Sequence, residues 1–378
     1  MLRTPFASER VKRVDPVTGI GVTQLTSYPA PSAHLLYDWP SVTPDNRILL
    51  FSQRETRRDA PWDLFRVDAD GLNLFQVTER GDRAEMGGYY GRPAARLTLD
   101  GRRVLMAWGH QLVSVDVETG VVEDLLSLDG EIAGKFTVGN IHLTSATELL
   151  YLVCTGPGGR ENFRVDLGNN EVLKLEMDGM ISCCDPTGPR LVVSMGTVEW
   201  GTEVREDGSR IIINRGDLRE RWLTDEFGER IERLCPEIFA HSTLLGNRLA
   251  VQGCGLPPER CIWLVERGEE PRRLAEGPYF WHSGASWDGE WIAADTNWPN
   301  EGIQLVHVPT GNHSTLCQSG ASQDHYEFGH PHPLLSRDGR LCVFRSDRTG
   351  VPQIYVAHVT EDFRSMVTRG ELNDGEGT

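Results

Sequence analysis

The chain contains 378 residues, of which 39% are hydrophobic and 25% are charged, so it is long and apolar enough to bury a large core. Its 38 lysines and arginines are outnumbered by 55 aspartates and glutamates, which gives a net charge of −17. This balance argues against a nucleic-acid partner or an anionic-membrane partner, and it requires a local cluster of cations for any anionic ligand.

One sequence unit recurs along the chain: a polar turn, an apolar strand, a loop, a second strand and a short third strand. In chain order its copies are residues 41–53 with 63–78, 96–108 with 111–126, 144–154 with 162–175, 185–195 with 207–214, 244–253 with 261–274, 285–295 with 303–316, and 333–347 with 352–359. The first two and the last two copies are the clearest. Units of about 40 to 58 residues are long enough for four-stranded blades.

We therefore predict an all-β fold, a seven-bladed β-propeller that forms a single domain over residues 1–378. Residues 19–26 are expected to close the ring by joining the last blade. Helices should be few because no segment keeps a 3.6-residue apolar period, and residues 220–234 are where we expect a short one. Two stacked β-sandwiches are the alternative, although they do not need a regular blade-sized period.

Three histidines begin equivalent positions of adjacent units. His282 opens the segment HSGASWDG, and His330 and His332 open HPHPLLSRDG. Each proline stiffens the chain and favours an extended histidine before it, so His330 and His332 should point the same way and converge with His282 on one ion. Glu327 or Gln323 would supply an oxygen ligand. Such a set suits a first-row divalent metal such as Mn, Fe, Co, Ni or Zn, whereas the plainer interpretation is a turn beside a core histidine.

These segments resemble the oligogalacturonate lyases. HPHP followed by S-x-D-G-x-x-x-x-F-x-S-D-R-x-G-x-P-x-I-Y (336–355) is similar to the last full blade of that family. Residues 282–295 are similar to its preceding blade, and His34 with Tyr37 and T-P-D-N is similar to its first blade. The resemblance implies a seven-bladed propeller that binds a divalent metal, usually manganese, through three histidines and a glutamine, and that splits unsaturated galacturonate disaccharides and short oligomers by β-elimination.

Carried over by position, the resemblance implies that the metal histidines are His282, His330 and His332. The glutamine's place, three residues before His330, holds Glu327, whose carboxylate would bind the ion more tightly and weaken it as a Lewis acid. The family's general base corresponds to His241. Its arginine, which is followed by a tryptophan, corresponds to Arg221, which would clamp the substrate carboxylate.

Four further residues are candidate substrate contacts. His34 has the register of a residue at the channel mouth, and Tyr90 and Arg92 lie in a glycine-rich loop before a blade strand. Trp281 flanks the expected metal site and could stack on a sugar ring, although buried aromatic packing is more common. Tyr90 and Arg92 fit blade packing equally well.

The resemblance and the residues together predict a metal-dependent lyase. The C5 proton of a uronate becomes removable when cations stabilise the neighbouring carboxylate, and His241, neutral near pH 7, would accept it. The expected partner is an acidic oligosaccharide from pectin, and the expected metal is manganese, with Zn, Fe, Co or Ni open. Two alternatives are a hydrolase or epimerase that uses the same metal site on another acidic sugar, and a non-catalytic TolB-like propeller that binds a partner.

The compartment follows from two absences in the sequence. No stretch approaches the roughly 20 apolar residues that span a bilayer, and residues 1–15 lack the apolar core of a signal peptide, so we expect a cytoplasmic protein without a membrane partner. No paired CxxC spacing occurs, so the cysteines are expected to be reduced core thiols: 154, 183, 184, 235, 254, 261, 317 and 342.

Overall fold

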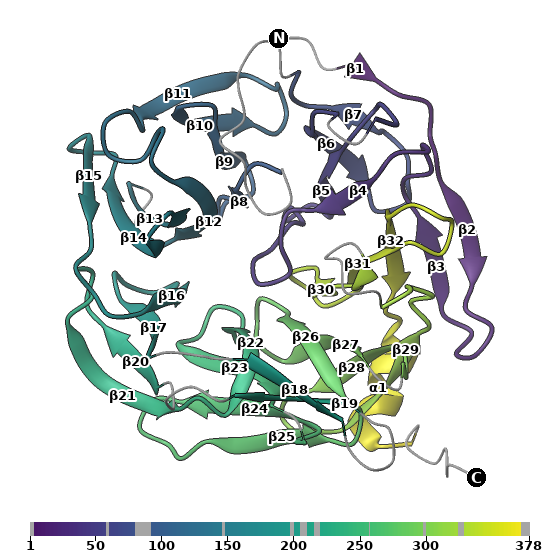
Figure 1. The fold of residues 1–378 in the computed structure, drawn as a ribbon. Coiled ribbons are helices and arrows are strands. Elements are labelled where there is room, and N and C mark those ends of the chain that lie inside the picture. The colour runs from purple at the N-terminus through teal and green to yellow at the C-terminus, as the bar shows by residue number, and fades with distance from the viewer. Residues whose placement is uncertain are drawn as a thin grey trace.

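The computed structural model describes residues 4–57, 60–79, 92–145, 148–196, 200–204, 210–214, 220–256, 258–297, 300–323 and 329–371. Seven antiparallel sheets are arranged as a ring around a central axis (Figure 1). Each sheet is one blade, so the predicted seven-bladed all-β propeller is confirmed.

The first four blades lie between residues 4 and 236. Blade 1 contains β4 (Ser32–His34), β5 (Arg47–Ser52), β6 (Asp63–Asp68) and β7 (Phe75–Gln76), with β1 (Thr4–Pro5) at its outer edge. Blade 2 contains β8 (Ala95–Leu97), β9 (Arg103–Trp108), β10 (Gln111–Asp116) and β11 (Val122–Ser127). Blade 3 contains β12 (Thr137–Leu143), β13 (Leu149–Gly156), β14 (Gly159–Asp166) and β15 (Glu171–Lys174). Blade 4 contains β16 (Met180–Cys184), β17 (Leu191–Met195), β20 (Glu220–Thr224) and β21 (Arg230–Pro236).

The remaining three blades complete the ring. Blade 5 contains β22 (Phe239–Leu244), β23 (Ala250–Gly255), β24 (Cys261–Glu266) and β25 (Arg272–Glu276). Blade 6 contains β26 (Phe280–Ala285), β27 (Trp291–Thr296), β28 (Ile303–His307) and β29 (His313–Cys317). Blade 7 contains β30 (Leu334–Leu335), β31 (Leu341–Ser346) and β32 (Gln353–His358), followed outward by β3 (Gly21–Gln24) and β2 (Val11–Val14).

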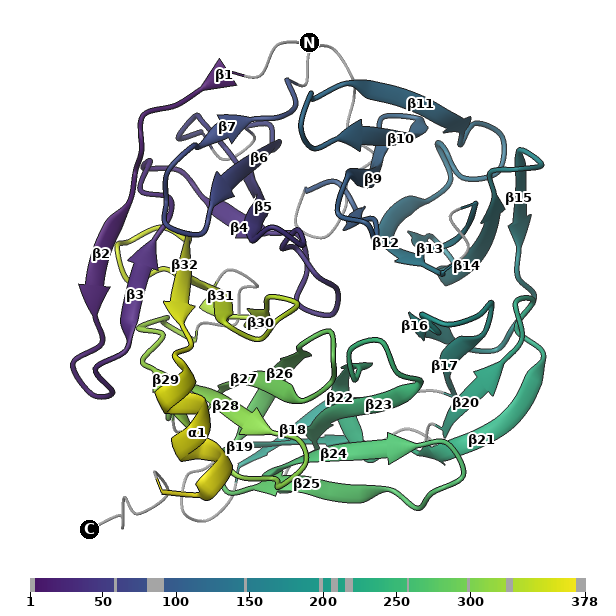
Figure 2. The same cartoon turned by 180° about the vertical axis from the view of Figure 1, so that it is seen from behind.

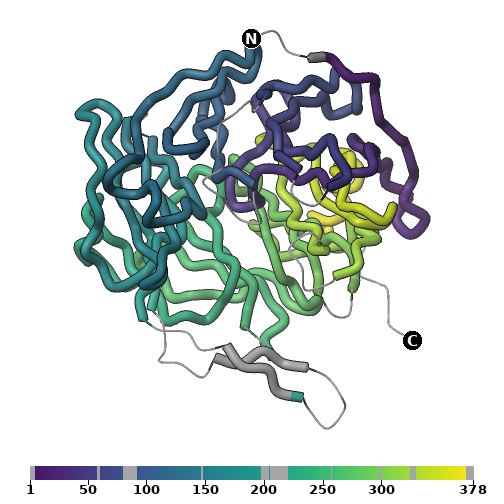
Figure 3. Tube along the Cα trace, turned by 45° about the horizontal axis from the view of Figure 1, so that its top comes forward, coloured from purple at the N-terminus to yellow at the C-terminus, as the bar shows by residue number. Residues whose placement is uncertain are grey.

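Blade 7 joins the two ends of the chain. β3, which lies within residues 19–26, pairs with β32 in the register Val22 with Ala357 and Gln24 with Tyr355. The N-terminal segment therefore lies beside the C-terminal strands, as the tilted view shows (Figure 3). Hydrogen bonds between the two ends of the chain therefore hold the ring closed.

The core lies between the blades. Buried apolar residues of the described chain fall into seven clusters, and each cluster joins one pair of neighbouring blades. Between blades 1 and 2, for example, Leu49 and Phe51 pack with Val104 and Met106. Because both faces of a blade are covered, β5, β27 and β31 are nearly continuous apolar runs without polar alternation.

The recurring S/T-x-D-G motif forms the turn between the first two strands of a blade. At 286–289, Asp288 accepts hydrogen bonds from the Ser286 hydroxyl at 2.5 Å and from the Glu290 N–H at 3.0 Å, and Gly289 has φ +72. The same arrangement occurs at 98–101 and at 336–339. Glycine adopts this left-handed backbone without a steric cost, which explains why the motif recurs.

These turns meet at one end of the central channel. The Arg337 guanidinium lies over the Trp287 ring at 5.0 Å and donates to the Leu99 carbonyl, so turns of blades 2, 6 and 7 close that end. Inside is a cavity of about 40 Å³ with lining residues from every blade, among them Asp38, Arg96, His142, Cys183, Thr243, Ala285 and Leu334. The cavity has a mixed polar and apolar lining, and a cavity of this size holds a few waters.

Two local predictions were wrong, both in blade 4. Residues 220–234 form most of β20 and β21, because Leu223 pairs with Val192 of β17 in the sheet. The second copy in this blade, 207–214, contains β19 (Arg210–Asn214), which pairs with β18 (Trp200–Val204) in a separate hairpin between β17 and β20. An inserted hairpin carries an apolar run like that of a blade strand. Residues 207–214 were therefore wrongly predicted as the third strand of blade 4, which is β20.

The described residues form one α-helix, α1 (Glu361–Arg369), which lies against β28 and β29 (Figure 2). The Thr360 side chain caps its first turn, and Gly370 with φ 72 ends it. Phe363 and Val367 bury its apolar face in the cluster between blades 6 and 7. In the part of the chain that the structure describes, no helix has the length and apolarity needed to cross a bilayer.

Substitution of Leu25 tests the contribution of the joined ends. Leu25 follows β3, is fully buried, and packs with Ile354 and Val356 of blade 7. We expect Leu25→Ala to lower the free energy of unfolding in urea by about 2 to 5 kcal/mol, the usual cost of a core cavity. Val17→Ala, at a residue that is 69% exposed, should change it little. Equal effects of the two changes would contradict this role.

The pH dependence of stability tests the burial of His142 in the channel. Burial, helped by Arg96, lowers the pKa of His142 to about 3. The unfolded chain takes up a proton on this ring below about pH 6.5 while the folded chain does not, so stability is lost as the pH falls from 6.5 toward 3. We expect His142→Gln to flatten the loss of urea stability between pH 7 and pH 5. His110→Gln, at an exposed ring, should leave the slope unchanged.

Candidate metal centre

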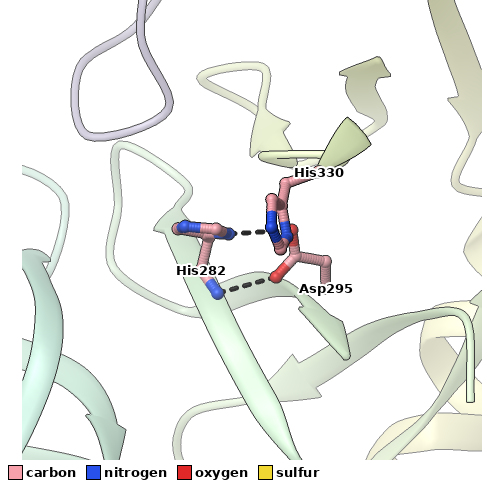
Figure 4. A group of neighbouring side chains, drawn as sticks. All are labelled: His282, Asp295 and His330. Carbon is pink, nitrogen blue, oxygen red and sulfur yellow. Dashed lines mark hydrogen bonds and ion pairs between the residues drawn. The ribbon is translucent and has the colours of Figure 1, made fainter. Parts of the chain in front are cut away.

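His282 and Asp295 form a buried pair on neighbouring strands of blade 6. β26 and β27 are antiparallel, and a register shift between Phe280 and Ser283 turns His282 toward Asp295. Asp295 Oδ1 accepts the backbone N–H of His282 at 2.7 Å, and Oδ2 lies 3.0 Å from His282 Nδ1 (Figure 4). With its Nδ1 proton held by the carboxylate, the His282 ring presents Nε2 as a metal ligand.

Burial decides the charges of this pair. It raises the pKa of Asp295 to about 6, although His330 and two backbone N–H groups favour the charged form. It also lowers the pKa of His282 well below the usual value, and the neighbouring His330 lowers it further. His282 is therefore a neutral imidazole, the form that binds metals.

His330 brings a third ligand from blade 7. His282, Asp295 and His330 each offer one ligand atom, and these atoms lie within 4.8 Å of one another. Figure 4 shows the three side chains converging from the start of β26, from β27 and from the segment before β30. Two imidazole nitrogens and a carboxylate oxygen are donors that suit a first-row divalent ion. The residues present therefore fit such a metal.

His332 lies beside this group. Its Nε2 is 3.1 Å from His282 Nε2, close to the roughly 3.0 Å that separates two nitrogens bound at a right angle to one ion. Its Nδ1 is in contact with the Arg345 guanidinium. A neutral ring that accepts from Arg345 carries its proton on Nε2 and donates it to His282. Binding of a metal through His332 Nε2 therefore requires the contact between His332 and Arg345 to rearrange.

Backbone strain is concentrated at the candidate site. Apart from asparagines, the described non-glycine residues with positive φ are His241 at 50°, Gln323 at 58° and His332 at 48°. All three were singled out from the sequence as site residues. His332 was expected to be extended because Pro333 follows it, and that expectation was wrong. Its N–H donates to Asp295 Oδ2 at 3.0 Å, and this tertiary contact overrides the local preference.

Gln323 remains a candidate oxygen ligand. Its backbone N–H donates to the carbonyl of Gly329, the residue before His330, at 3.0 Å. Both polar atoms of its amide are buried without a hydrogen-bond partner among the described residues. Buried amides in proteins nearly always have a hydrogen-bond partner, so this amide is a candidate to bind one. Glu327, the other candidate, lies outside the described residues.

His241 lies against the metal group from blade 5. Its ring centroid is 4.4 Å from that of His282 and 4.7 Å from that of Trp281. Burial lowers the pKa of His241 well below its usual value, and His282 lowers it further. Tyr37 Oη lies 3.4 Å from His241 Nδ1. The ring is neutral, as a proton acceptor must be.

Arg221 is close to His241 but engaged with other groups. It is 3% exposed, its Nη2 donates to Glu237 Oε1 at 2.9 Å, and its Nη1 donates to the hydroxyl of Ser242 at 2.7 Å. Glu237 offsets the positive charge that was expected to face a substrate. The contact with Ser242, the residue after His241, links Arg221 to the candidate base through the backbone.

The expected substrate contacts are placed unevenly. Trp281 is half-buried beside His241, at the site. His34 is buried, and it helps to lower the pKa of His332. Arg92 is also buried, and its Nη1 donates to the His34 carbonyl at 2.9 Å. Tyr90 lies outside the described residues.

The sequence analysis missed two residues of this site. Asp295 was read only as part of a blade motif, although the S-W-D-G turn places residue 295 opposite residue 282 in a hairpin. Tyr37 was noted only for its resemblance, yet its ring lies 5.1 Å from His282 and 5.0 Å from His332. No pattern in the sequence connects Tyr37 to these histidines across the ring.

Comparison with known proteins bears on the fold. No protein-family model matches the chain, and no curated protein matches it in sequence. A solved structure described as oligogalacturonate lyase in complex with manganese superposes with a TM-score of 0.74, at 17% identity over 96% of this chain and 99% of that one. The chain shares its fold with oligogalacturonate lyases. The oligogalacturonate lyase of Vibrio parahaemolyticus gives a TM-score of 0.73 at 16% identity, over 96% of this chain and 100% of that one.

A propeller of this type occurs in proteins of other activities. A puromycin-hydrolyzing peptidase from Mycobacterium tuberculosis has a TM-score of 0.57 and 13% identity, over 89% of this chain and 55% of that one. At such identities the likeness to the oligogalacturonate lyases and to the peptidase concerns the fold, and the function has to be argued from the site.

Metal retention tests the group of His282, Asp295 and His330. We expect wild-type protein that is loaded with Mn²⁺ and dialysed to retain about one ion per chain, as measured by elemental analysis. His282→Ala and His330→Ala should each lose it, because each removes a ligand. His110→Ala removes an exposed histidine far from the group and should retain the ion. Equal retention by all four proteins would contradict the assignment.

Proposed function

We propose that this protein is a metal-dependent lyase that cleaves short uronate-containing oligosaccharides by β-elimination. The observation that carries the proposal is the convergence of His282, Asp295 and His330 beside a neutral His241, in a fold shared with oligogalacturonate lyases. Unsaturated digalacturonate and short oligogalacturonates are the proposed substrates. A role in pectin breakdown and a cytoplasmic location remain predictions.

The proposed cofactor is a divalent metal, with manganese first because one of the structural neighbours is a manganese complex. His282, Asp295 and His330 would hold it, with His332 and an oxygen from Gln323 or Glu327 as further ligands. A bound ion supplies Lewis acidity at the substrate carboxylate. A carboxylate ligand lowers the net charge of the centre. Its donor atoms also suit Zn, Fe, Co and Ni, so these metals are alternatives to manganese.

His241 is the proposed base. Its burial keeps the ring neutral, and the ring lies directly against His282, so a uronate whose carboxylate is bound there would have its C5 near this ring. His241 takes the C5 proton, the bond between C4 and the glycosidic oxygen breaks as the 4,5-double bond forms, and the leaving oxygen takes up a proton from water to become a hydroxyl group. Positioned proton transfer of this kind contributes roughly 10² to 10⁴ in rate.

Two other side chains are assigned roles around this step. Trp281, whose ring faces His241, offers an apolar face for a sugar ring. Arg221 fixes the segment that carries His241 through its bond to Ser242, and its ion pair with Glu237 keeps that charge satisfied when buried. A direct clamp by Arg221 on the substrate carboxylate stays a prediction.

Product analysis tests the proposal. Metal-loaded protein given unsaturated digalacturonate should yield two keto-uronates whose summed mass equals that of the substrate, as measured by mass spectrometry. His241→Asn should lower the rate by about 10² to 10⁴ while retaining the metal, because only the proton acceptor is lost. His313→Asn serves as the matched control, because His313 lies in the outer strand β29 of blade 6, where its Nε2 is bonded to the carbonyl of Glu276.

The other outcomes select the alternatives. Products heavier than the substrate by one water would indicate a hydrolase, and an uncleaved isomer of the substrate would indicate an epimerase. No conversion of any uronate oligomer, together with no retained metal, would leave a non-catalytic propeller.

A further inference from the structure

The segment between β4 and β5 projects from blade 1 into the central channel (Figure 1). Its attachment to blade 2 is an ion pair: the two carboxylate oxygens of Asp38 accept from the two terminal nitrogens of Arg96, each at 2.8 Å. The next residue adds a third bond, from Trp39 Nε1 to the Leu97 carbonyl at 2.7 Å. The segment is therefore fixed to β8 at two consecutive residues.

Arg96 is itself held rigidly. It is 1% exposed, its Nε donates to the Ile141 carbonyl at 2.6 Å, and its Nη2 donates to Asn140 Oδ1 at 2.8 Å. A planar guanidinium that is bonded on two edges has little freedom to turn. The anchor therefore joins blade 1 to blades 2 and 3 inside the channel.

The residue before Asp38 faces the candidate metal centre. Tyr37 packs its ring on His282 and His332, and its hydroxyl lies 3.4 Å from His241 Nδ1. Its backbone is confined as well: a Cβ on Gly284 would lie 2.9 Å from the Tyr37 carbonyl oxygen and 2.9 Å from that of Pro333. Blades 6 and 7 thus hold Tyr37 from one side while Asp38 is held from the other.

We propose that Arg96 and Asp38 are positioning residues that hold Tyr37 against His241 and so set the orientation of the candidate base. The inference rests on the proposed function for the role of His241 as base. When His241 Nδ1–H donates to the Tyr37 hydroxyl oxygen, the neutral ring presents Nε2 as the proton acceptor. Tyr37 orients His241 through this hydrogen bond, and the ion pair between Asp38 and Arg96 determines where Tyr37 lies.

The position of Tyr37 can be measured without any assay of activity. The chain has eight tyrosines, so protein labelled with 3-fluorotyrosine gives a small set of ¹⁹F signals, and Tyr37→Phe identifies the signal of residue 37. Arg96→Met and the nearly isosteric Asp38→Asn should shift or broaden that signal. Gly284→Ala should also move it, because the new methyl group pushes the Tyr37 carbonyl.

Arg164→Met is the matched control for loss of a buried arginine. Arg164 is 9% exposed and pairs with Asp166 at 3.5 Å and Glu226 at 3.3 Å, in blade 3 away from the channel. It should leave the Tyr37 signal in place even where it lowers the thermal midpoint as much as Arg96→Met does. An unchanged Tyr37 signal in both Arg96→Met and Asp38→Asn overturns the proposal.

Kinetics then test the consequence. Arg96→Met, Asp38→Asn and Tyr37→Phe should lower kcat on digalacturonate by up to about 100-fold with KM within a few-fold of wild type, because misplacement of a catalytic group by about 1 Å has that effect. Arg96→Lys, which keeps the charge but not the two-pronged contact, should recover part of the loss. Wild-type kcat in the three variants overturns the role. If wild-type protein converts no uronate, the proposed function fails, and the ¹⁹F signals alone decide whether the anchor exists.

Discussion

One carboxylate joins two blades at the candidate metal centre. Asp295 accepts the backbone and ring N–H groups of His282 in blade 6 and the backbone N–H of His332 in blade 7. It is 1% exposed, so its charge is retained only because these donors and the neighbouring His330 compensate for lost hydration. This acceptor therefore fixes the backbone of the His282 segment and that of the His332 segment relative to each other.

The contacts of Asp295 also explain the strained backbone nearby. His332 has φ 48, a conformation that costs free energy in a residue other than glycine, and its N–H donates to Asp295. His241 in blade 5 has φ 50 and lies against His282. Strain of this kind persists where surrounding contacts determine the geometry, and here three successive blades contribute those contacts.

Part of the fold and of the site could be predicted from the sequence. The S/T-x-D-G turns and the apolar runs that follow them marked the blades, because each blade needs the same turn and the same double-sided burial. The equal register of His282 and His330 in adjacent units placed both at one end of the ring, and the structure brings their ligand atoms together. The hairpin in blade 4 was misread because an apolar run carries no information about which strand it will pair with.

What the sequence by itself determined is the repeat: its period, its turns and its burial pattern follow from local geometry, and a ring of blades is the way such units cover one another. Only the tertiary structure decided which side chains share the site. Tyr37 and Asp295 are 258 positions apart, yet both contact His282, because ring closure brings blade 1 beside blade 7 and the segment after β4 projects into the channel (Figure 1). Contacts across the axis of a propeller depend on the positions of whole blades, and no periodic pattern within a single blade encodes them.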